Sequence, residues 1–171
     1  MIESKYLKDN LANINRLYTI PAFKGVETKD LGQLLKICKI RQYGDGEIII
    51  EEGGNDPWLY FIMSGKVQVF KKGIVIHAFH KVGDIFGEKR FLDNFTRAET
   101  VSSEGKTICL AIDTSAKARI GPEVDVDRLV KILYLIIADF LSVRLREANE
   151  KLIKCKMENI VLRAKLEDLT S

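Results

Sequence analysis

The sequence is poor in the residues that build disulfide frameworks and metal sites. Its 171 residues include only three cysteines, Cys38, Cys109 and Cys155, and two histidines, His77 and His80. Three widely spaced cysteines form neither a disulfide framework nor a zinc ligand set, so we expect them to be small buried hydrophobic residues. The two histidines stand three residues apart on an expected strand, where they face opposite sides and cannot chelate one metal together. We therefore expect no metal and no cofactor.

The sequence also lacks a long apolar run and an excess of charge of one sign. Its most apolar stretch, residues 129–141, is interrupted by Lys131 and Asp139, so it falls short of the roughly 18 to 20 apolar residues of a membrane span. The N-terminus, MIESKYLKDN, has no apolar core and does not resemble a secretory signal. Lys plus Arg number 27 against 24 Asp plus Glu, which gives no general attraction to nucleic acid or to anionic membranes. These absences predict a cytoplasmic protein.

The distribution of glycine and proline divides the chain near residue 115. Residues 123–171 contain neither residue, whereas short apolar runs alternate with glycine-bearing turns before that point. In residues 1–36 the apolar spacing predicts a helix over residues 5–18 and a second helix with Thr28 as its N-cap. Residues 37–114 contain runs of strand length separated by turns such as Ser64-Gly65 and Lys72-Gly73. These runs predict a mainly β sandwich or barrel with flanking helices.

One segment, residues 83–101, does not fit the regular alternation of strands and turns. A strand ending at Phe86 meets Gly87, a short helical turn begins at Glu88, and Arg97 stands just before the next strand. Glycine allows close approach of the backbone, while free N–H groups and a guanidinium bind anionic oxygens. From the residues alone, the segment is either an anion site or a structural ion pair between Glu88 and Arg97.

Residues 20–114 resemble the cyclic nucleotide-binding domain of the catabolite activator (Crp/Fnr-like) family and of cyclic nucleotide-regulated kinases and channels. The resemblance is carried by the segments IPAFKGV, YGDGEII, LYFIMSGKV, FGE (residues 86–88) and RAET (residues 97–100). It implies a double-stranded β-helix, or jelly-roll, barrel over residues 37–114, with a phosphate-binding cassette at residues 83–101. It also implies a non-catalytic protein that senses cAMP, in preference to cGMP.

The resemblance assigns roles within the cassette. Glu88 would accept a hydrogen bond from the ribose 2′-hydroxyl, Arg97 would pair with the cyclic phosphate, and backbone amides from Gly87 onward would complete the phosphate cradle. The sequence departs from the family pattern at five positions, which are Lys89, Arg90, Thr96, Ala98 and Glu99.

Two of these departures bear on the phosphate. Ala98 lacks the hydroxyl that often helps to hold it, and Glu99 adds a carboxylate that Lys89 or Arg90 could neutralise. The alternative is a degenerate pocket, kept as a scaffold for protein interactions without nucleotide.

Residues 115–171 form a hinge and a long helix with a heptad seam over residues 141–169. Its apolar positions alternate by four and three residues, and the seam consists of Leu141, Leu145, Ala148, Leu152, Cys155, Asn159, Leu162, Leu166 and Leu169. An asparagine at an a position favours a parallel, in-register dimer, so we expect a homodimer. A helix of about 69 Å is also too long to pack only against its own small barrel.

The long helix bears on ligand and partners as well. In the family a helix of this kind lies over the pocket, and Asn149 stands where it could read an adenine edge. Acidic and basic residues are equally frequent from Gly121 onward, and the sequence stops without a helix-turn-helix domain. We therefore expect no direct nucleic acid binding, and the downstream protein partner is unknown.

Overall fold

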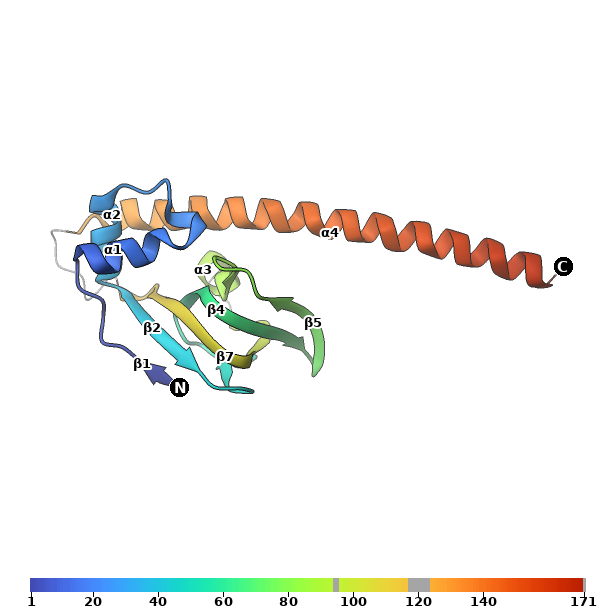
Figure 1. Cartoon of the computed structure of the whole chain (residues 1–171), viewed down its shortest axis with the longest axis horizontal. Coiled ribbons are helices and arrows are strands. Elements are labelled where there is room, and N and C mark those ends of the chain that lie inside the picture. Colours follow the sequence, from blue (N-terminus) through green and yellow to red (C-terminus); the bar gives the residue numbers. More distant parts are fainter. Residues whose placement is uncertain (94–95, 117–123, 171) are drawn as a thin grey trace. The chain divides into compact units, whose positions relative to one another are not determined.

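The computed structural model describes residues 1–93, 96–116 and 124–170, except for the side chains of Asp93 and of residues 167–170. The chain forms two compact units, Met1–Ile136 and Ile137–Ser171. Figure 1 shows the strands and the short helices of the first unit, together with the long helix that both units share.

The N-terminal elements are β1 (Ile2–Glu3), α1 (Leu11–Tyr18), the 3-10 helix η1 (Pro21–Phe23) and α2 (Thr28–Leu35). The expectation of a helix from residue 5 is wrong for residues 5–10. The N–H groups of Ser4 and Leu7 instead donate to Ile40 and Cys38, both at 2.9 Å, so this segment lies along the next strand.

The two N-terminal helices differ in how their first turns are capped. Helix α1 begins after Asn10, whose side chain accepts a hydrogen bond from the backbone of Asn13 at 2.9 Å. Helix α2 begins at Thr28 and is preceded by Glu27, which makes no side-chain cap. Thr28 is therefore the first helical residue and not the N-cap.

The strands of the first unit form one antiparallel seven-stranded sheet. Their bounds are β2 (Cys38–Tyr43), β3 (Ile48–Ile50), β4 (Trp58–Lys71), β5 (Ile74–Phe79), β6 (Ile85–Phe86) and β7 (Thr100–Asp113). The main order is β1-β2-β7-β4-β5, with β3 paired to β7 and β6 paired to β4. The mainly β fold class is confirmed, and Figure 1 shows β2, β7, β4 and β5 side by side.

The sheet is built around two strands that are longer than the sequence predicts. The expected hairpin turn at Ser64-Gly65 is wrong, because β4 and β7 each run through 14 residues as a continuous pair with local register shifts. Gly65 has φ +96°, and a Cβ there would lie 2.6 Å from the carbonyl oxygen of Lys106. The glycine therefore lets two long strands approach closely at a bulge and does not end either of them.

The core of the first unit includes the first part of β4. Leu59, Tyr60, Phe61 and Ile62 are consecutive and all at most 1% exposed, so both faces of this strand are buried. Tyr60 stacks on Phe86 of β6 with ring centroids 5.0 Å apart. This packing fixes β6, and with it the segment that follows at Gly87.

The remaining elements are the short helix α3 (Glu88–Asp93) and the long helix α4 (Val126–Thr170). Within the first unit, Arg128 of α4 donates to both carboxylate oxygens of the buried Asp30, each at 2.8 Å. This ion pair ties the first turns of α4 to α2. In the part of the chain that is described, no helix is long and apolar enough to cross a membrane.

The cysteines follow the sequence prediction in two of three cases. Cys38 and Cys109 are buried, and burial raises the pKa of the Cys109 thiol to about 12. Cys155 is exposed on α4, so the expectation of a buried residue is wrong for the single chain.

Candidate functional site

The site begins where β6 ends, at a glycine with little space around it. Gly87 has φ +80°, and a Cβ there would lie 2.8 Å from Nη1 of Arg97, 3.0 Å from Ile50 and 3.1 Å from the carbonyl oxygen of Trp58. Any side chain would both strain the backbone and displace these neighbours. Glycine therefore lets the start of α3 pack directly against the arginine.

Arg97 lies inside the protein, and its side chain is only 3% exposed. Nε and Nη2 donate to the two carboxylate oxygens of Asp56 at 2.9 and 2.7 Å, which is a bidentate ion pair. Nη1 donates to the carbonyl of Gly87 at 2.7 Å, and Nη2 donates a second time to the carbonyl of Trp58. A guanidinium has five N–H groups, so within the described residues one N–H of Nη1 is left for a ligand.

The backbone of Arg97 is fixed as firmly as its side chain. Its N–H donates to the carbonyl of Gly54 at 2.9 Å, and its carbonyl accepts from the N–H of Gly53 at 2.8 Å. The loop between β3 and β4 therefore holds both ends of the residue, since Asp56 belongs to the same loop. This arrangement fixes the position of the positive charge before any ligand arrives.

A second ion pair links α3 to the residues that follow Arg97. Nζ of Lys89 donates to Oε1 of Glu99, and the side chains are 51% and 22% exposed. Arg90, the next residue of α3, donates to Oδ1 of Asn55 at 3.3 Å. The sequence offered Lys89 or Arg90 as the base that neutralises Glu99, and in the structure Lys89 forms this ion pair.

A fourth cation, Lys71 at the end of β4, contacts the segment after Arg97. It donates to the backbone carbonyl of Ala98 and lies 3.1 Å from the carboxylate of Glu52. The hydrogen bond from Lys71 holds the pKa of Glu52 below its ordinary value. The backbone directly after Arg97 is therefore anchored to β4, in addition to the bonds between Arg97 and the loop before β4.

These groups enclose a small hollow. It is lined by Ile50, Gly87, Glu88, Lys89, Arg90, Arg97, Ala98, Glu99 and Val101, and its volume is about 20 Å³. A site for a single water molecule needs roughly 10–15 Å³, and pockets for small ligands have roughly 300–1,000 Å³. The hollow itself is therefore much smaller than a pocket that encloses a small ligand.

Six of the seven predicted ligand residues meet at this hollow, namely Gly87, Glu88, Lys89, Arg97, Ala98 and Glu99. Glu88, the first residue of α3, is 6% exposed. Asn149 lies on α4 in the second unit, where it is exposed, and its part in the site stays a prediction. Among the described departures from the family pattern, Arg90 also lines the hollow and Thr96 does not.

Sequence reasoning missed the residues that hold Arg97 from the far side. Asp56 and Trp58 lie 41 and 39 positions before it in the chain. The only local signal was the turn Asn55-Asp56-Pro57 ahead of an apolar strand, and a turn does not say which distant residue its carboxylate will meet. The described residues contain no group of three His, Cys, Asp or Glu that could hold a metal.

Comparison with known proteins gives one domain family. Residues 40–120 match the family model of the cyclic nucleotide-binding domain. The cAMP-dependent protein kinase regulatory subunit of Eremothecium gossypii is 31% identical over 114 residues, which cover 66% of this chain and 25% of that protein. The chain thus spans about a quarter of the length of the curated relatives that it matches.

Solved structures show the same fold. A cyclic nucleotide-binding domain from Methylobacillus flagellatus KT is 18% identical with a TM-score of 0.66, covering 82% of this chain and 80% of that one. The regulatory subunit of a cAMP-independent protein kinase A from Trypanosoma cruzi, bound to guanosine, is 28% identical with a TM-score of 0.56 and covers 68% and 43%. The predicted jelly-roll fold with a long C-terminal helix is confirmed.

Proposed function

We propose that this chain is a regulatory ligand sensor whose cassette binds cAMP, because residues 40–120 match the family model of the cyclic nucleotide-binding domain. Arg97 carries the proposal. Its fixed guanidinium lines the same hollow as Gly87 and the buried carboxylate of Glu88. A guanidinium beside a carboxylate suits a ligand that has both an anionic phosphate and a hydroxyl donor.

Each cassette residue has a defined role in this proposal. Arg97 pairs with the cyclic phosphate, Glu88 accepts from the ribose 2′-hydroxyl, and the backbone from Gly87 onward contributes N–H groups. Asn149 of α4 reads the base, which favours adenine. The matching curated relatives are regulatory subunits, and we propose a regulatory, non-catalytic role here as well.

Isothermal titration calorimetry with cAMP, cGMP, adenosine and guanosine tests the proposal. We expect cAMP to bind with a dissociation constant in the micromolar range or below, and to bind more tightly than cGMP. The two nucleosides separate recognition of the phosphate from recognition of base and ribose. No heat with cAMP at millimolar concentration, together with an unchanged melting temperature, would contradict the proposal.

A second candidate is a scaffold that binds no nucleotide. The observation in its favour is the small size of the hollow, which has a volume of about 20 Å³. Two of the residues that line it, Lys89 and Glu99, form an ion pair with each other. The same titration separates the two candidates, because a scaffold gives no heat with any of the four compounds.

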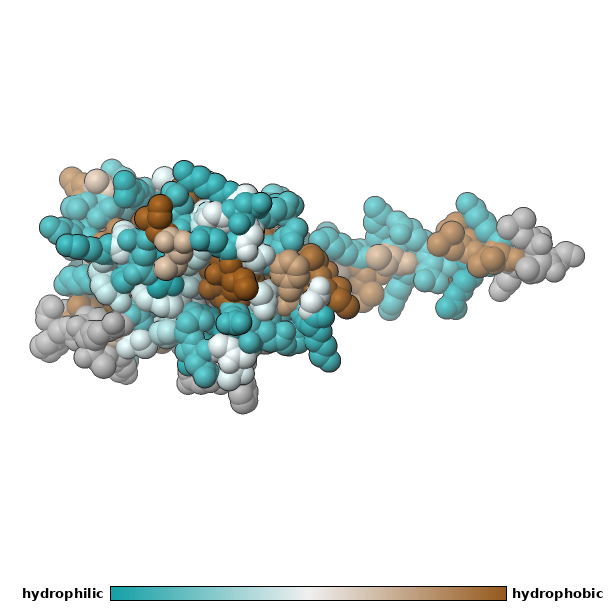
Figure 2. All heavy atoms as spheres, turned by 90° about the horizontal axis from the view of Figure 1, so that it is seen from below, coloured by the Kyte–Doolittle hydropathy of each residue, from teal (hydrophilic) through white to brown (hydrophobic). Residues whose placement is uncertain are grey.

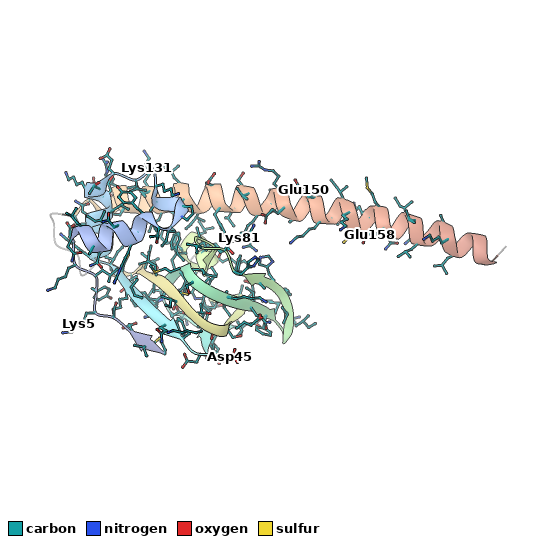
Figure 3. The ribbon with its side chains drawn as sticks, in the orientation of Figure 1. Lys5, Asp45, Lys81, Lys131, Glu150 and Glu158 are labelled. Carbon is teal, nitrogen blue, oxygen red and sulfur yellow. The ribbon has the colours of Figure 1, made fainter. Side chains whose placement is uncertain are left out.

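We also propose that the chain acts as a parallel homodimer through α4, which would carry the bound state onward. Most described side chains of the seam are exposed in the single chain, including Leu145, Leu152, Leu162 and Leu166 at 53–64%. Figure 2 shows hydrophobic side chains grouped along this helix between hydrophilic ones, and Glu150 and Glu158 project from it in Figure 3. The side chain of Leu169 lies outside the described residues.

Asn159, the asparagine of the seam, has a hydrogen-bond partner within its own chain. Oδ1 of Asn159 accepts from Nε of Arg163 at 3.1 Å. In a dimer this bond competes with contacts between the two Asn159 side chains, and Arg163 would otherwise be available to Glu158 of the second copy. Register would then rest on the leucines as much as on Asn159.

Analytical ultracentrifugation of two adjacent variants tests the seam. Leu152 and Ile153 are equally exposed, at 53% and 54%, but only Leu152 belongs to the seam. We expect Leu152→Glu to raise the dimer dissociation constant by about a hundredfold or more, because it places like charges at an a position. Ile153→Glu is the matched control and should leave the dimer intact. Equal dissociation by both variants would contradict the assigned face.

A further inference from the structure

The ion pair between Lys89 and Glu99 joins two residues that line the candidate site. Lys89 comes from α3 and Glu99 from the segment before β7, so the pair joins two sides of the hollow. Glu99 is the less exposed partner, with 22% of its side chain accessible. Its carboxylate therefore places an anion in the lining of the same hollow as Arg97 and Lys89.

The other cations around the hollow already have partners within the protein. Arg97 is bound by Asp56, and Arg90 donates to Asn55. Lys71 pairs with Glu52. Lys89 is bound to Glu99, an acid that lines the hollow too. Breaking this one pair would free a cation and also open space.

We propose that Glu99 is a built-in competitor for the ligand phosphate, and that Lys89 exchanges the Glu99 carboxylate for the phosphate when ligand binds. This inference rests on the proposed function and identifies a specificity-determining residue within the same site. Glu99 selects against negative charge on the ligand, so it weakens binding of a cyclic nucleotide but not of an uncharged nucleoside.

The exposure of the pair suits an exchange of partners. Ion pairs between partly exposed side chains are weak, since water and salt screen them. A phosphate that also meets Arg97 can therefore displace Glu99, whereas a buried pair would keep the site closed. The expected result is a sensor of reduced affinity and not an inactive one.

Calorimetric titrations of the full chain with cAMP and with adenosine test the exchange. We expect Glu99→Gln, which keeps the size of the side chain and removes its charge, to bind cAMP roughly tenfold more tightly. The affinity for adenosine should stay within about twofold, because adenosine carries no charge. Lys89→Met should weaken binding of cAMP and leave adenosine unchanged.

A matched control removes an equal charge outside the site. Glu104 on β7 pairs with Lys66 at 2.7 Å, both side chains are 41% exposed, and neither lines the hollow. We expect Glu104→Gln to bind both compounds as the wild type does. Melting temperatures of all variants check that the fold is retained.

The outcomes distinguish failure of this inference from failure of the proposed function on which it rests. If the wild type binds cAMP and Glu99→Gln gains nothing, or gains equally for adenosine, the competitor role is wrong while the proposed function stands. A gain seen with Glu99→Ala but not with Glu99→Gln would mean that Glu99 acts by its size, which also overturns the inference. If neither the wild type nor Glu99→Gln binds cAMP at millimolar concentration, the proposed function itself fails.

Discussion

Replacing Arg97 with alanine is expected to raise the dissociation constant for cAMP by at least roughly a hundredfold, because the phosphate loses a charge-assisted hydrogen bond and the attraction of a nearby positive charge. The same change should lower the free energy of unfolding by about 2–4 kcal/mol. The structural cost arises because the carbonyls of Gly87 and Trp58 and the carboxylate of Asp56 all lose their donor. Calorimetry and urea denaturation measure the two effects separately.

A second substitution distinguishes loss of binding from loss of fold. Asp56→Ala in the Arg97→Ala background removes the carboxylate that the first change left unpaired, so part of the lost stability should return. We expect a coupling energy of about 1–3 kcal/mol between the two residues. Binding should not return, since the cation is still missing.

Two results would contradict this account of Arg97. Full binding of cAMP by the Arg97→Ala variant would mean that another group holds the phosphate. Recovery of binding in the double variant would mean that the single change acted only through the fold. Lysine at position 97 is an informative intermediate, because it keeps the charge but cannot form the bidentate pair with Asp56.

The part of the site that lies close together in the sequence could be predicted from the resemblance of its motif, whereas the residues alone left open an anion site or a structural ion pair between Glu88 and Arg97. Gly87, Glu88 and Arg97 lie within one strand-turn-helix segment and meet at one hollow. Asp56 could not be predicted, since its contact with Arg97 spans 41 positions and depends on how the loop before β4 meets the end of α3. Residue types in a motif therefore indicated which residues line the hollow, but not which distant residues hold Arg97 in place.

The fold class could be predicted for a similar reason, while the strand boundaries could not. Alternating apolar runs indicated a mainly β body, and the sheet bears this out. Ser64-Gly65 has the composition of a hairpin turn, yet it lies within β4 because the backbone of Lys106 packs against Gly65. A glycine in the sequence is compatible with a turn or with a close approach of two strands. Only the tertiary contact distinguishes these two cases.

Gly87 is another glycine at a close approach, so we expect its substitution to affect both stability and binding. Replacing it with alanine should lower the free energy of unfolding by about 2–4 kcal/mol, through a strained backbone and through overpacking against Arg97 and Ile50. The displaced guanidinium should also weaken binding of cAMP by roughly tenfold or more, since phosphate contacts depend on its position.

Gly73, in the turn between β4 and β5, is the matched control for this substitution. Its φ of +77° is close to the +80° of Gly87, but a Cβ there would meet nothing within 4 Å. Gly73→Ala therefore carries only the cost of the left-handed backbone, about 1–2 kcal/mol, and should leave the affinity for cAMP unchanged. The difference between the two variants, measured by urea denaturation and calorimetry, isolates the close approach of Gly87 to Arg97. Equal losses of stability with equal affinities would mean that the fixed position of Arg97 does not depend on the absence of a side chain at residue 87.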